Sequence, residues 1–159
     1  MATPMTGTPE PLDPATESRV RDSFERQGLM AHLGASLVEV RKGFARIRMP
    51  FRPELTQQHG YFHAGGASAI ADSAGGYAGF SLFPPNSSVL TVEFKINLLA
   101  PAVGNCLEAT GTVIRSGRTL TVCQLEVFAI EGDNRTAVAV GQQTLMRLAA
   151  RTGDGGSPG

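Results

Sequence analysis

The chain has 159 residues, enough for one domain with a substantial core, and its 14 basic residues balance its 14 acidic ones. A formal net charge of zero argues against broad electrostatic binding to nucleic acid or to an anionic membrane surface. The N-terminus shows no basic start followed by an apolar run, and the spacing of Cys106 and Cys123 matches no metal site. We therefore expect a cytoplasmic protein with two buried free thiols and no metal, bound neither to nucleic acid nor to a membrane.

Both ends of the chain are predicted to be flexible tails, over residues 1–15 and 150–159, because they are rich in Pro, Gly, Ser and Thr. Residues 16–149 between them are expected to form a single domain. This domain opens on a short helix that runs to about residue 30 and is capped by Thr16 or Ser18.

Two strands are predicted next, over residues 35–43 and 44–50. Lys42 and Gly43 form the turn between them, so the pair is a hairpin. An irregular loop over residues 52–62 then leads into a long helix.

The long helix is predicted over residues 63–79, which read HAGGASAIADSAGGYAG. An interior Gly costs about 1 kcal/mol relative to Ala in a helix, so several such residues together suggest a helix packed tightly against a sheet. Asp72 lies inside this stretch, where a carboxylate is costly to desolvate. Two interpretations stay open at this point: a general base or nucleophile, or a structural carboxylate that interacts with the helix dipole or a buried Arg. The small neighbours Ala69, Ser73 and Gly76 leave room beside the carboxylate and favour a pocket.

The rest of the chain is predicted to be four strands. In the first, apolar residues alternate with polar ones from Leu90 to Leu98, a period of two that predicts one buried face. The four predicted strands cover residues 89–99, 105–115, 119–130 and 136–148, with turns at Ser116-Gly117 and Asp133-Asn134. The order of helix, two strands, long helix and four strands favours an α+β protein in which a curved antiparallel sheet wraps one helix.

The start of the long helix is a candidate binding site. The backbone N–H groups of His63, Ala64 and Gly65 lack helical partners there and can receive a carbonyl oxygen, as in an oxyanion hole. The alternative is a loop-to-helix junction in which Gly is needed only for steric reasons. For His63 itself we favour a structural role over acid–base chemistry.

Other polar residues are weaker candidates, each with a solvated surface position as the alternative. The side-chain amide of Gln57 can donate to a carbonyl, and the hydroxyl of Thr91 can orient a water. Lys95, Arg115 and Arg118 can meet a phosphate group.

Several of these residues together resemble the PaaI-type hotdog-fold acyl-CoA thioesterases. Residues 57–65 read QQHGYFHAG, Asp72 follows nine residues after His63, and residues 91–97 read TVEFKIN before Pro101-Ala102. The family pattern is Asn/Gln-x-x-G-x-x-H-G-G with an Asp nine residues after the His. Gln here takes the place of the Asn found in many members, and Ala64 takes the place of a Gly. The likeness runs from about residue 34 to residue 148.

The resemblance implies a hotdog fold and hydrolysis of a coenzyme A thioester. Asp72 would be the general base or the nucleophile, and these two mechanisms stay open. The N–H of Ala64 or Gly65 would polarise the thioester carbonyl, helped by Gln57. Thr91 would help to place the water, and His63 would shape the loop.

The resemblance also implies a substrate rather than a cofactor, since coenzyme A arrives as part of the acyl-CoA. An aryl or medium-chain acyl group would enter a pocket near Phe62 and Tyr77. The substrate-binding candidates nearer the surface are Lys95, Asn97, Arg115 and Arg118.

Spacing along the long helix adds an argument for an oligomer. Ala64 and Asp72 are eight residues apart, or roughly 12 Å at 1.5 Å per residue, so one thioester carbonyl cannot meet both within a chain. Two antiparallel helices in a two-fold dimer would bring Asp72 of one chain to the helix N-terminus of the other. The family resemblance implies the same dimer, and a homotetramer is common among its members.

Two alternatives to a thioesterase remain. One is a non-catalytic acyl-CoA-binding module with the same fold, which would keep the pocket without needing Asp72. The other is a hotdog hydratase, which we rank lower because no His follows Asp72 in the pattern that such enzymes carry.

Overall fold

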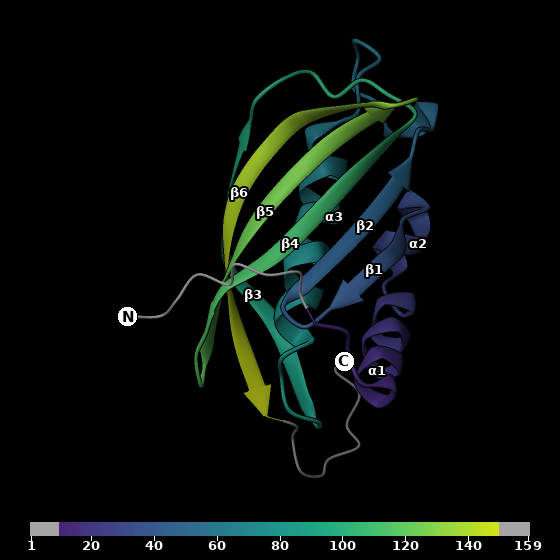
Figure 1. Ribbon diagram of the computed structural model, residues 1–159. Helices are drawn as coiled ribbons and strands as arrows, with labels where there is room; N and C mark the ends of the chain where they lie inside the picture. The colour runs from purple at the N-terminus through teal and green to yellow at the C-terminus, as the bar shows by residue number, and fades with distance from the viewer. Residues whose placement is uncertain (1–9, 150–159) are drawn as a thin grey trace, which may run out of the picture.

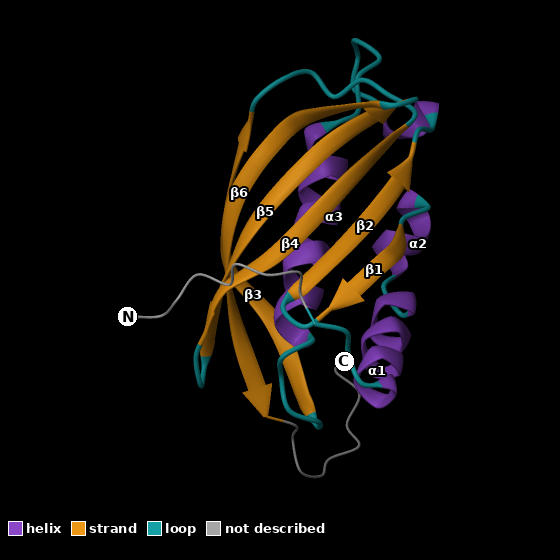
Figure 2. Cartoon of the chain, viewed as in Figure 1, coloured by secondary structure: helices purple, strands orange, loops and turns teal. Residues whose placement is uncertain are grey.

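A single long helix, α3, lies in the curve of a six-stranded antiparallel sheet in this computed structural model, which describes residues 10–149 (Figure 1). The strand order within the described residues is β1-β2-β4-β5-β6-β3, and the two short helices α1 and α2 lie beside β1 (Figure 2). The predicted α+β architecture is confirmed. The elements are α1 Pro14–Glu25, α2 Gly28–Leu33, β1 Ser36–Arg41, β2 Phe44–Pro50, the 3-10 turn η1 Pro53–Leu55, α3 Ala64–Phe80, β3 Ser87–Leu98, β4 Cys106–Ser116, β5 Leu120–Glu131 and β6 Asn134–Ala149.

The N-terminal helix differs from its prediction at both ends. Asp13 is the cap, since its side chain accepts from the Thr16 N–H at 3.0 Å, so the expected caps Thr16 and Ser18 are wrong. Pro14 fits the first helical position, because that position needs no N–H donor. The helix ends at Glu25 rather than near residue 30, and α2 follows as a separate helix.

Residues 10–13 also belong to the folded part of the chain. Lys42 in the β1–β2 turn donates to the Glu10 carboxylate at 2.8 Å, and its backbone N–H donates to the Glu10 carbonyl at 2.9 Å. The expected tails therefore overlap the described residues only over 10–15, while 1–9 and 150–159 lie outside them.

Arg19 of α1 holds the C-terminal end of α3. Its guanidinium donates to the carbonyl of Phe80, the last residue of α3, at 3.3 Å, and to those of Phe83 at 2.8 Å and Pro84 at 2.7 Å. It also lies 4.5 Å from the centre of the Phe80 ring. A cation beside the last carbonyls of a helix is favourable because that end carries partial negative charge. Arg19 thus fixes α1 against the end of α3.

Small residues let α3 lie close to the sheet, as the sequence predicted. A Cβ at Gly111 of β4 would lie 2.4 Å from backbone atoms of Ala74 and Gly75, and one at Gly79 would lie 2.4 Å from the Leu145 side chain. Buried side chains of the sheet, such as Leu107 and Leu125, fill the remaining space around the helix. The position of Asp72 is therefore set by close contacts on both sides of the helix–sheet interface.

Strand β3 lies at one edge of the sheet, and the prediction of a buried face for it is wrong within a single chain. Leu90, Val92 and Leu98 are 53%, 50% and 59% exposed. The alternation is also interrupted by a bulge between Thr91 and Glu93. Alternation indicates a face that is meant to be covered, but it does not specify whether the same chain covers it.

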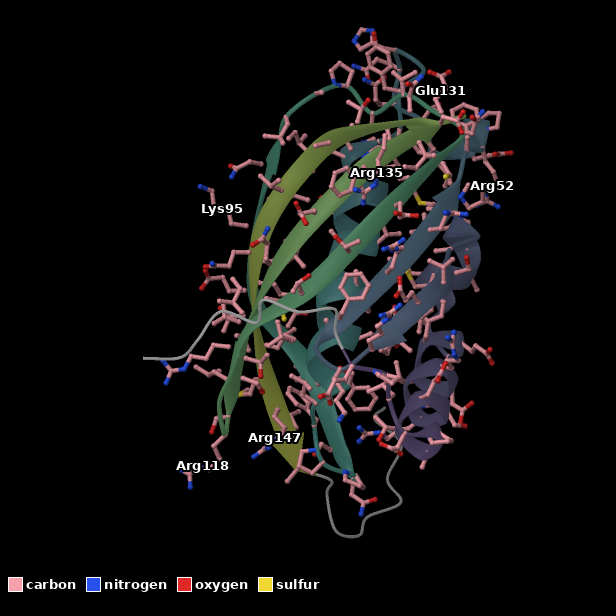
Figure 3. The ribbon with its side chains drawn as sticks, in the orientation of Figure 1. Arg52, Lys95, Arg118, Glu131, Arg135 and Arg147 are labelled. Carbon is pink, nitrogen blue, oxygen red and sulfur yellow. The ribbon has the colours of Figure 1, made fainter. Side chains whose placement is uncertain are left out.

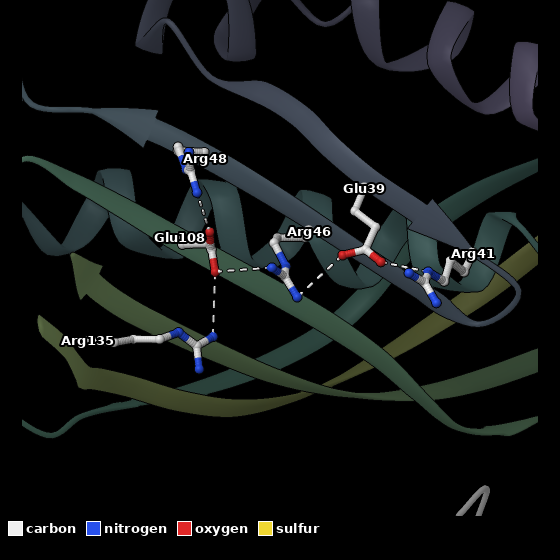
Figure 4. Close-up of polar contacts among 6 residues, drawn as sticks. All are labelled: Glu39, Arg41, Arg46, Arg48, Glu108 and Arg135. Atoms are coloured by element: carbon white, nitrogen blue, oxygen red, sulfur yellow. Dashed lines mark hydrogen bonds and ion pairs between the residues drawn. The ribbon is translucent and has the colours of Figure 1, made fainter. Parts of the chain in front are cut away.

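The outer face of the sheet carries a network of charged side chains (Figure 4). The Glu108 side chain is only 5% exposed and lies 2.9 Å from Arg48, 3.6 Å from Arg135 and 3.8 Å from Arg46. Its hydrogen bond raises the pKa of Arg48. The arginine side chains and their ion pairs therefore cover this face of the sheet. Arg135 also stacks over the Phe128 ring.

Within residues 10–149, no helix is long and apolar enough to cross a membrane. The same part of the chain holds no group of three or more His, Cys, Asp or Glu side chains that could bind a metal ion. The two cysteines lie in strands and both are free, as expected, but only Cys123 is buried. Cys106 is half-buried, so the expectation of two buried thiols is wrong for Cys106.

Candidate active site

Asp72 lies halfway along α3 and faces the edge of the sheet. Its Oδ1 accepts from the Thr91 hydroxyl at 2.7 Å and from Gln143 Nε2 at 2.6 Å. Among the described residues its other oxygen, Oδ2, accepts no hydrogen bond. The carboxylate is therefore fixed through one oxygen and free at the other.

Thr91 reaches Asp72 because of the bulge in β3. Thr91 pairs with Leu145, and Phe94 pairs with Gln143. The step from Thr91 to Phe94 is three residues on β3, whereas the step between their partners on β6 is two, so β3 holds one extra residue. A bulge changes which face a side chain lies on. It places the Thr91 hydroxyl on the inner face with Asp72, where it donates to the carboxylate instead of standing in the polar row that the alternation predicted.

Gln143 is the site residue that the sequence did not reveal. It lies on β6, its side chain is fully buried, and Nε2 also lies 3.0 Å from both the Asp72 carbonyl and the Thr91 hydroxyl. In the sequence it stands in a run, GQQT, that reads as ordinary strand. The only hint was its position two residues before Leu145, which puts it on the same face of the strand as that apolar side chain.

The N-terminus of α3 offers one free donor among the three N–H groups predicted, since the His63 N–H donates to the Leu55 carbonyl at 2.9 Å. His63 is the cap, and its Nδ1 accepts from the Gly65 N–H at 2.8 Å, so that N–H is occupied. Among the described residues the Ala64 N–H donates to no acceptor. Of the three predicted oxyanion donors, Ala64 is therefore the one available, and His63 has the structural role that the sequence favoured.

Gln57 lies beside this donor. Its Oε1 accepts from the His59 N–H, which orients the side chain, and both Gln57 and Ala64 line a cavity of about 400 Å³. The wall is otherwise mainly apolar, with Phe62 and Leu98 among its residues. The structure thus places Gln57 and Ala64 at one cavity, where Phe62 also lies. Tyr77, which was predicted to share a pocket with Phe62, lines a different cavity, so that pairing is wrong within a single chain.

Asp72 lines a different cavity, of about 390 Å³. Thr91, Tyr77 and Gln27 share this cavity with it. Gln27 donates to the Tyr77 hydroxyl at 2.8 Å and accepts from the Ser73 hydroxyl at 3.1 Å. The wall beside Asp72 is therefore polar, and it is built by α3 together with Gln27, which lies between α1 and α2.

The remaining predicted residues lie elsewhere. Lys95 and Asn97 line a third cavity, of about 280 Å³, with Gln142, the outward neighbour of Gln143 on β6. Arg115 is near the end of β4, and Arg118 is in the turn that follows it, at the end of the sheet where Arg147 also lies (Figure 3). The structure places none of these four side chains beside Asp72.

The two halves of a hydrolytic site are thus present in one chain but apart. A carboxylate with a free oxygen can take a proton from water or attack a carbonyl. A free N–H at a helix N-terminus can stabilise the negative charge that develops on a carbonyl oxygen. In one chain these groups line separate cavities.

A central helix wrapped by a six-stranded antiparallel sheet defines a hotdog-fold protein. The thioesterase superfamily profile matches residues 59–135, a segment that includes the N-terminus of α3, Asp72 and β3. A protein of Halobacterium salinarum with a provisional esterase assignment is 32% identical in an alignment of 131 positions that covers 77% of this chain and 86% of that protein. The chain belongs to the thioesterase superfamily.

Solved structures agree with this assignment. A thioesterase family protein from Silicibacter pomeroyi is 44% identical, with a TM-score of 0.83, over 85% of this chain and 99% of that one. The PaaI protein from the phenylacetic acid degradation operon of E. coli is 21% identical, with a TM-score of 0.76, over 85% of this chain and 94% of that one, and shows the same fold. The resemblance to PaaI-type hotdog proteins is confirmed.

Proposed function

We propose that this protein hydrolyses an acyl-coenzyme A thioester with Asp72 as the general base or nucleophile. The observation that carries the proposal is the asymmetric binding of the Asp72 carboxylate. Oδ1 receives hydrogen bonds from Thr91 and Gln143, and Oδ2 is left without one among the described residues, at a cavity large enough for part of a substrate.

Two reaction courses use this geometry. In the first, Asp72 takes a proton from water while the water oxygen attacks the thioester carbonyl carbon. The carbonyl oxygen becomes negative and accepts a hydrogen bond from the Ala64 N–H. The C–S bond then breaks, and the proton passes to the departing thiolate. In the second, Asp72 attacks the carbonyl carbon itself, coenzyme A leaves, and water hydrolyses the resulting anhydride.

The proposed active site is shared between two chains. Leu98 lines the cavity that holds Ala64, and Leu90 lines the cavity that holds Asp72. Both residues lie on the exposed edge strand β3. If two β3 strands paired antiparallel around an axis near Phe94, Leu98 of one chain would stand opposite Leu90 of the other, so the two different cavities would meet.

This pairing also supplies the cover that β3 lacks. A long edge strand with exposed apolar side chains is a template for pairing with another strand. A homodimer would satisfy the unpaired backbone groups of β3 and bury Leu90 and Val92. The proposed minimum assembly is therefore a homodimer, and a homotetramer built from two such dimers is the larger assembly we propose.

The acyl group is proposed to be an aryl or medium-chain group that occupies the cavity beside Asp72, against Tyr77. Arg115, Arg118, Lys95 and Asn97 stay proposals for contacts to the coenzyme A portion. None of the four lines the cavity that holds Asp72.

The test is thiol release from a panel of aryl- and medium-chain acyl-CoAs by wild type, Asp72→Asn and Asp133→Asn. The control Asp133 lies in the β5–β6 turn and undergoes the same chemical change. Loss of the base should lower kcat by roughly 100- to 10,000-fold, while calorimetry should show acyl-CoA binding unchanged. Asp133→Asn should retain wild-type kcat.

Equal turnover by wild type and Asp72→Asn would show that Asp72 has no catalytic role. Binding without turnover in the wild type would instead support the acyl-CoA-binding module.

A further inference from the structure

We infer that Gln143 is a positioning residue that orients Asp72 for the reaction and makes the fold less stable than it could be. The inference rests on the proposed function, because it assigns the residue that holds the reacting carboxylate. It comes from three observations: the donors around Asp72 Oδ1, a buried oxygen without a partner, and the close approach of Gly75.

The side-chain amide of Gln143 is directed entirely at Asp72 and Thr91. Nε2 carries two hydrogens, and three acceptors lie within 3.0 Å of it: Asp72 Oδ1, the Asp72 carbonyl and the Thr91 hydroxyl. The Thr91 hydroxyl in turn donates to the same Oδ1. Turning the amide around would bring its oxygen against Oδ1, so that two acceptors would face each other. The carboxylate therefore decides which end of the amide faces it.

The other end of the amide is left unsatisfied. Oε1 of Gln143 is buried and has no hydrogen-bond partner among residues 10–149. Burying a polar atom without a partner destabilises a fold. A group placed only for packing would not need an amide here, since an apolar side chain of similar length would avoid this loss.

The helix provides the space for this arrangement at Gly75. A Cβ at that position would lie 1.9 Å from Gln143 Oε1 and 2.6 Å from Leu125. Gly75 is an interior helix position, where Gly is itself unfavourable. Two locally unfavourable choices, Gly75 and the buried amide, thus coincide one turn from Asp72.

Fixing Oδ1 from two sides leaves Oδ2 as the reacting atom. With Gln143 removed, Thr91 alone would hold Oδ1, and the carboxylate could rotate about its own axis. Catalysis depends on the reacting atoms being held in place, and small displacements can lower the rate strongly. Gln143 does not reach the substrate in this arrangement, so its effect acts through Asp72.

The experiment compares wild type with Gln143→Met and Leu125→Ala. Met keeps a long unbranched side chain but removes both the donor and the unsatisfied oxygen. We expect kcat of Gln143→Met to fall by about 10- to 100-fold with KM nearly unchanged, while its Tm equals or exceeds that of the wild type. Leu125→Ala loosens the same helix contact without removing the donor, so any fall in its kcat should come with a fall in its Tm. Gln143→Met should lose kcat without a fall in Tm, which separates loss of the donor from a general loosening of α3.

A purely structural Gln143 would give the opposite result, a lower Tm with kcat retained, and this would overturn the inference. The Tm and the side-chain amide NMR signals need no substrate. If the wild type hydrolyses nothing, the proposed function fails by itself, and these two measurements still decide the role of Gln143. In that case an undiminished Tm, together with Gln143 amide protons that shift on Asp72→Asn, would support it, and a lowered Tm or unshifted protons would refute it.

Discussion

Three side chains from three different elements define the proposed reacting group at the residue scale. Asp72 comes from α3, Thr91 from β3 and Gln143 from β6, and all three meet within hydrogen-bond distance. The Thr91 hydroxyl donates to the Asp72 carboxylate, so it orients the proposed base directly. Because Thr91 and Gln143 both donate to Oδ1, this oxygen is fixed, while Oδ2 accepts no hydrogen bond among the described residues.

Cys123 gives a prediction about pH at the same scale. Burial raises the pKa of its thiol from 9.0 to about 12. The folded state therefore keeps a proton that the unfolded state loses near pH 9, so stability that is fully present below pH 9 decreases as the pH rises toward 12. The free energy of unfolding should fall by up to about 1.4 kcal/mol per pH unit in that window.

The measurement is chemical denaturation at pH 8 and pH 10.5, in a Cys106→Ala background so that one thiol is compared. Between these pH values the protein with Cys123 should lose about 2 kcal/mol more than Cys123→Ala does. The same pH loss in both proteins would contradict the prediction. A thiol that stays protonated also contributes little background to a thiol-release assay near neutral pH.

The position of α3 is the decisive feature at the element scale. The helix is held at its C-terminal end by Arg19, and along its length by backbone contact with β4 at Gly111. Its N-terminus is fixed by the His63 cap, which leaves the Ala64 N–H free. Because these contacts hold the helix in place against the sheet, Asp72 stays within hydrogen-bond distance of Thr91 and Gln143.

Gly111→Ala tests this contact. The new Cβ would lie 2.4 Å from the backbone of Ala74 and Gly75, and backbone atoms cannot move aside as a flexible side chain can. We expect the free energy of unfolding in urea to fall by about 3 kcal/mol, and kcat to fall as α3 shifts.

The matched control is Gly76→Ala, one residue beyond this contact on the same helix. A Cβ there meets no described atom within 4 Å, so the substitution should raise stability by up to about 1 kcal/mol. Similar losses in both variants would mean that close packing is not what requires glycine at 111.

The arrangement of the two cavities decides the behaviour of the whole molecule. They lie toward opposite ends of β3, the carboxylate in one and the free N–H in the other. One chain alone therefore offers two half-sites, and the proposed two-fold dimer makes two complete sites from them.

Mixed dimers of two inactive variants test this directly. Ala64→Pro removes the free N–H at the first helical position, where Pro is well accommodated, and the extended backbone of His63 suits a residue before Pro. Combined with Asp72→Asn in a heterodimer, it leaves one site with both an intact Asp72 and an intact Ala64. Heterodimers purified with two different tags should recover about half of the wild-type activity per dimer.

Homodimers of either variant serve as controls and should show little activity. A heterodimer no more active than these homodimers would place both groups in one chain's site and refute the shared site.

Local patterns in the sequence predicted much of this fold. The hairpin at Lys42-Gly43, the long helix and its close approach to the sheet, and the strands that follow are all present. These features depend on neighbouring residues, since side-chain period and turn residues act within a few positions. The cap at Asp13 was missed although it is local, because Thr16 and Ser18 offered competing cap residues nearby.

Contacts between distant parts of the chain could not be predicted in the same way. The sequence by itself determined the order of the elements, the small-residue helix and the choice of Asp72 as the central carboxylate. Only the tertiary structure decided that Gln143, 71 residues further on, donates to Asp72, and that β3 forms the edge of the sheet. The physical reason is that alternation records which side chains need cover, whereas strand order and the bulge at Thr91 decide what each side chain meets.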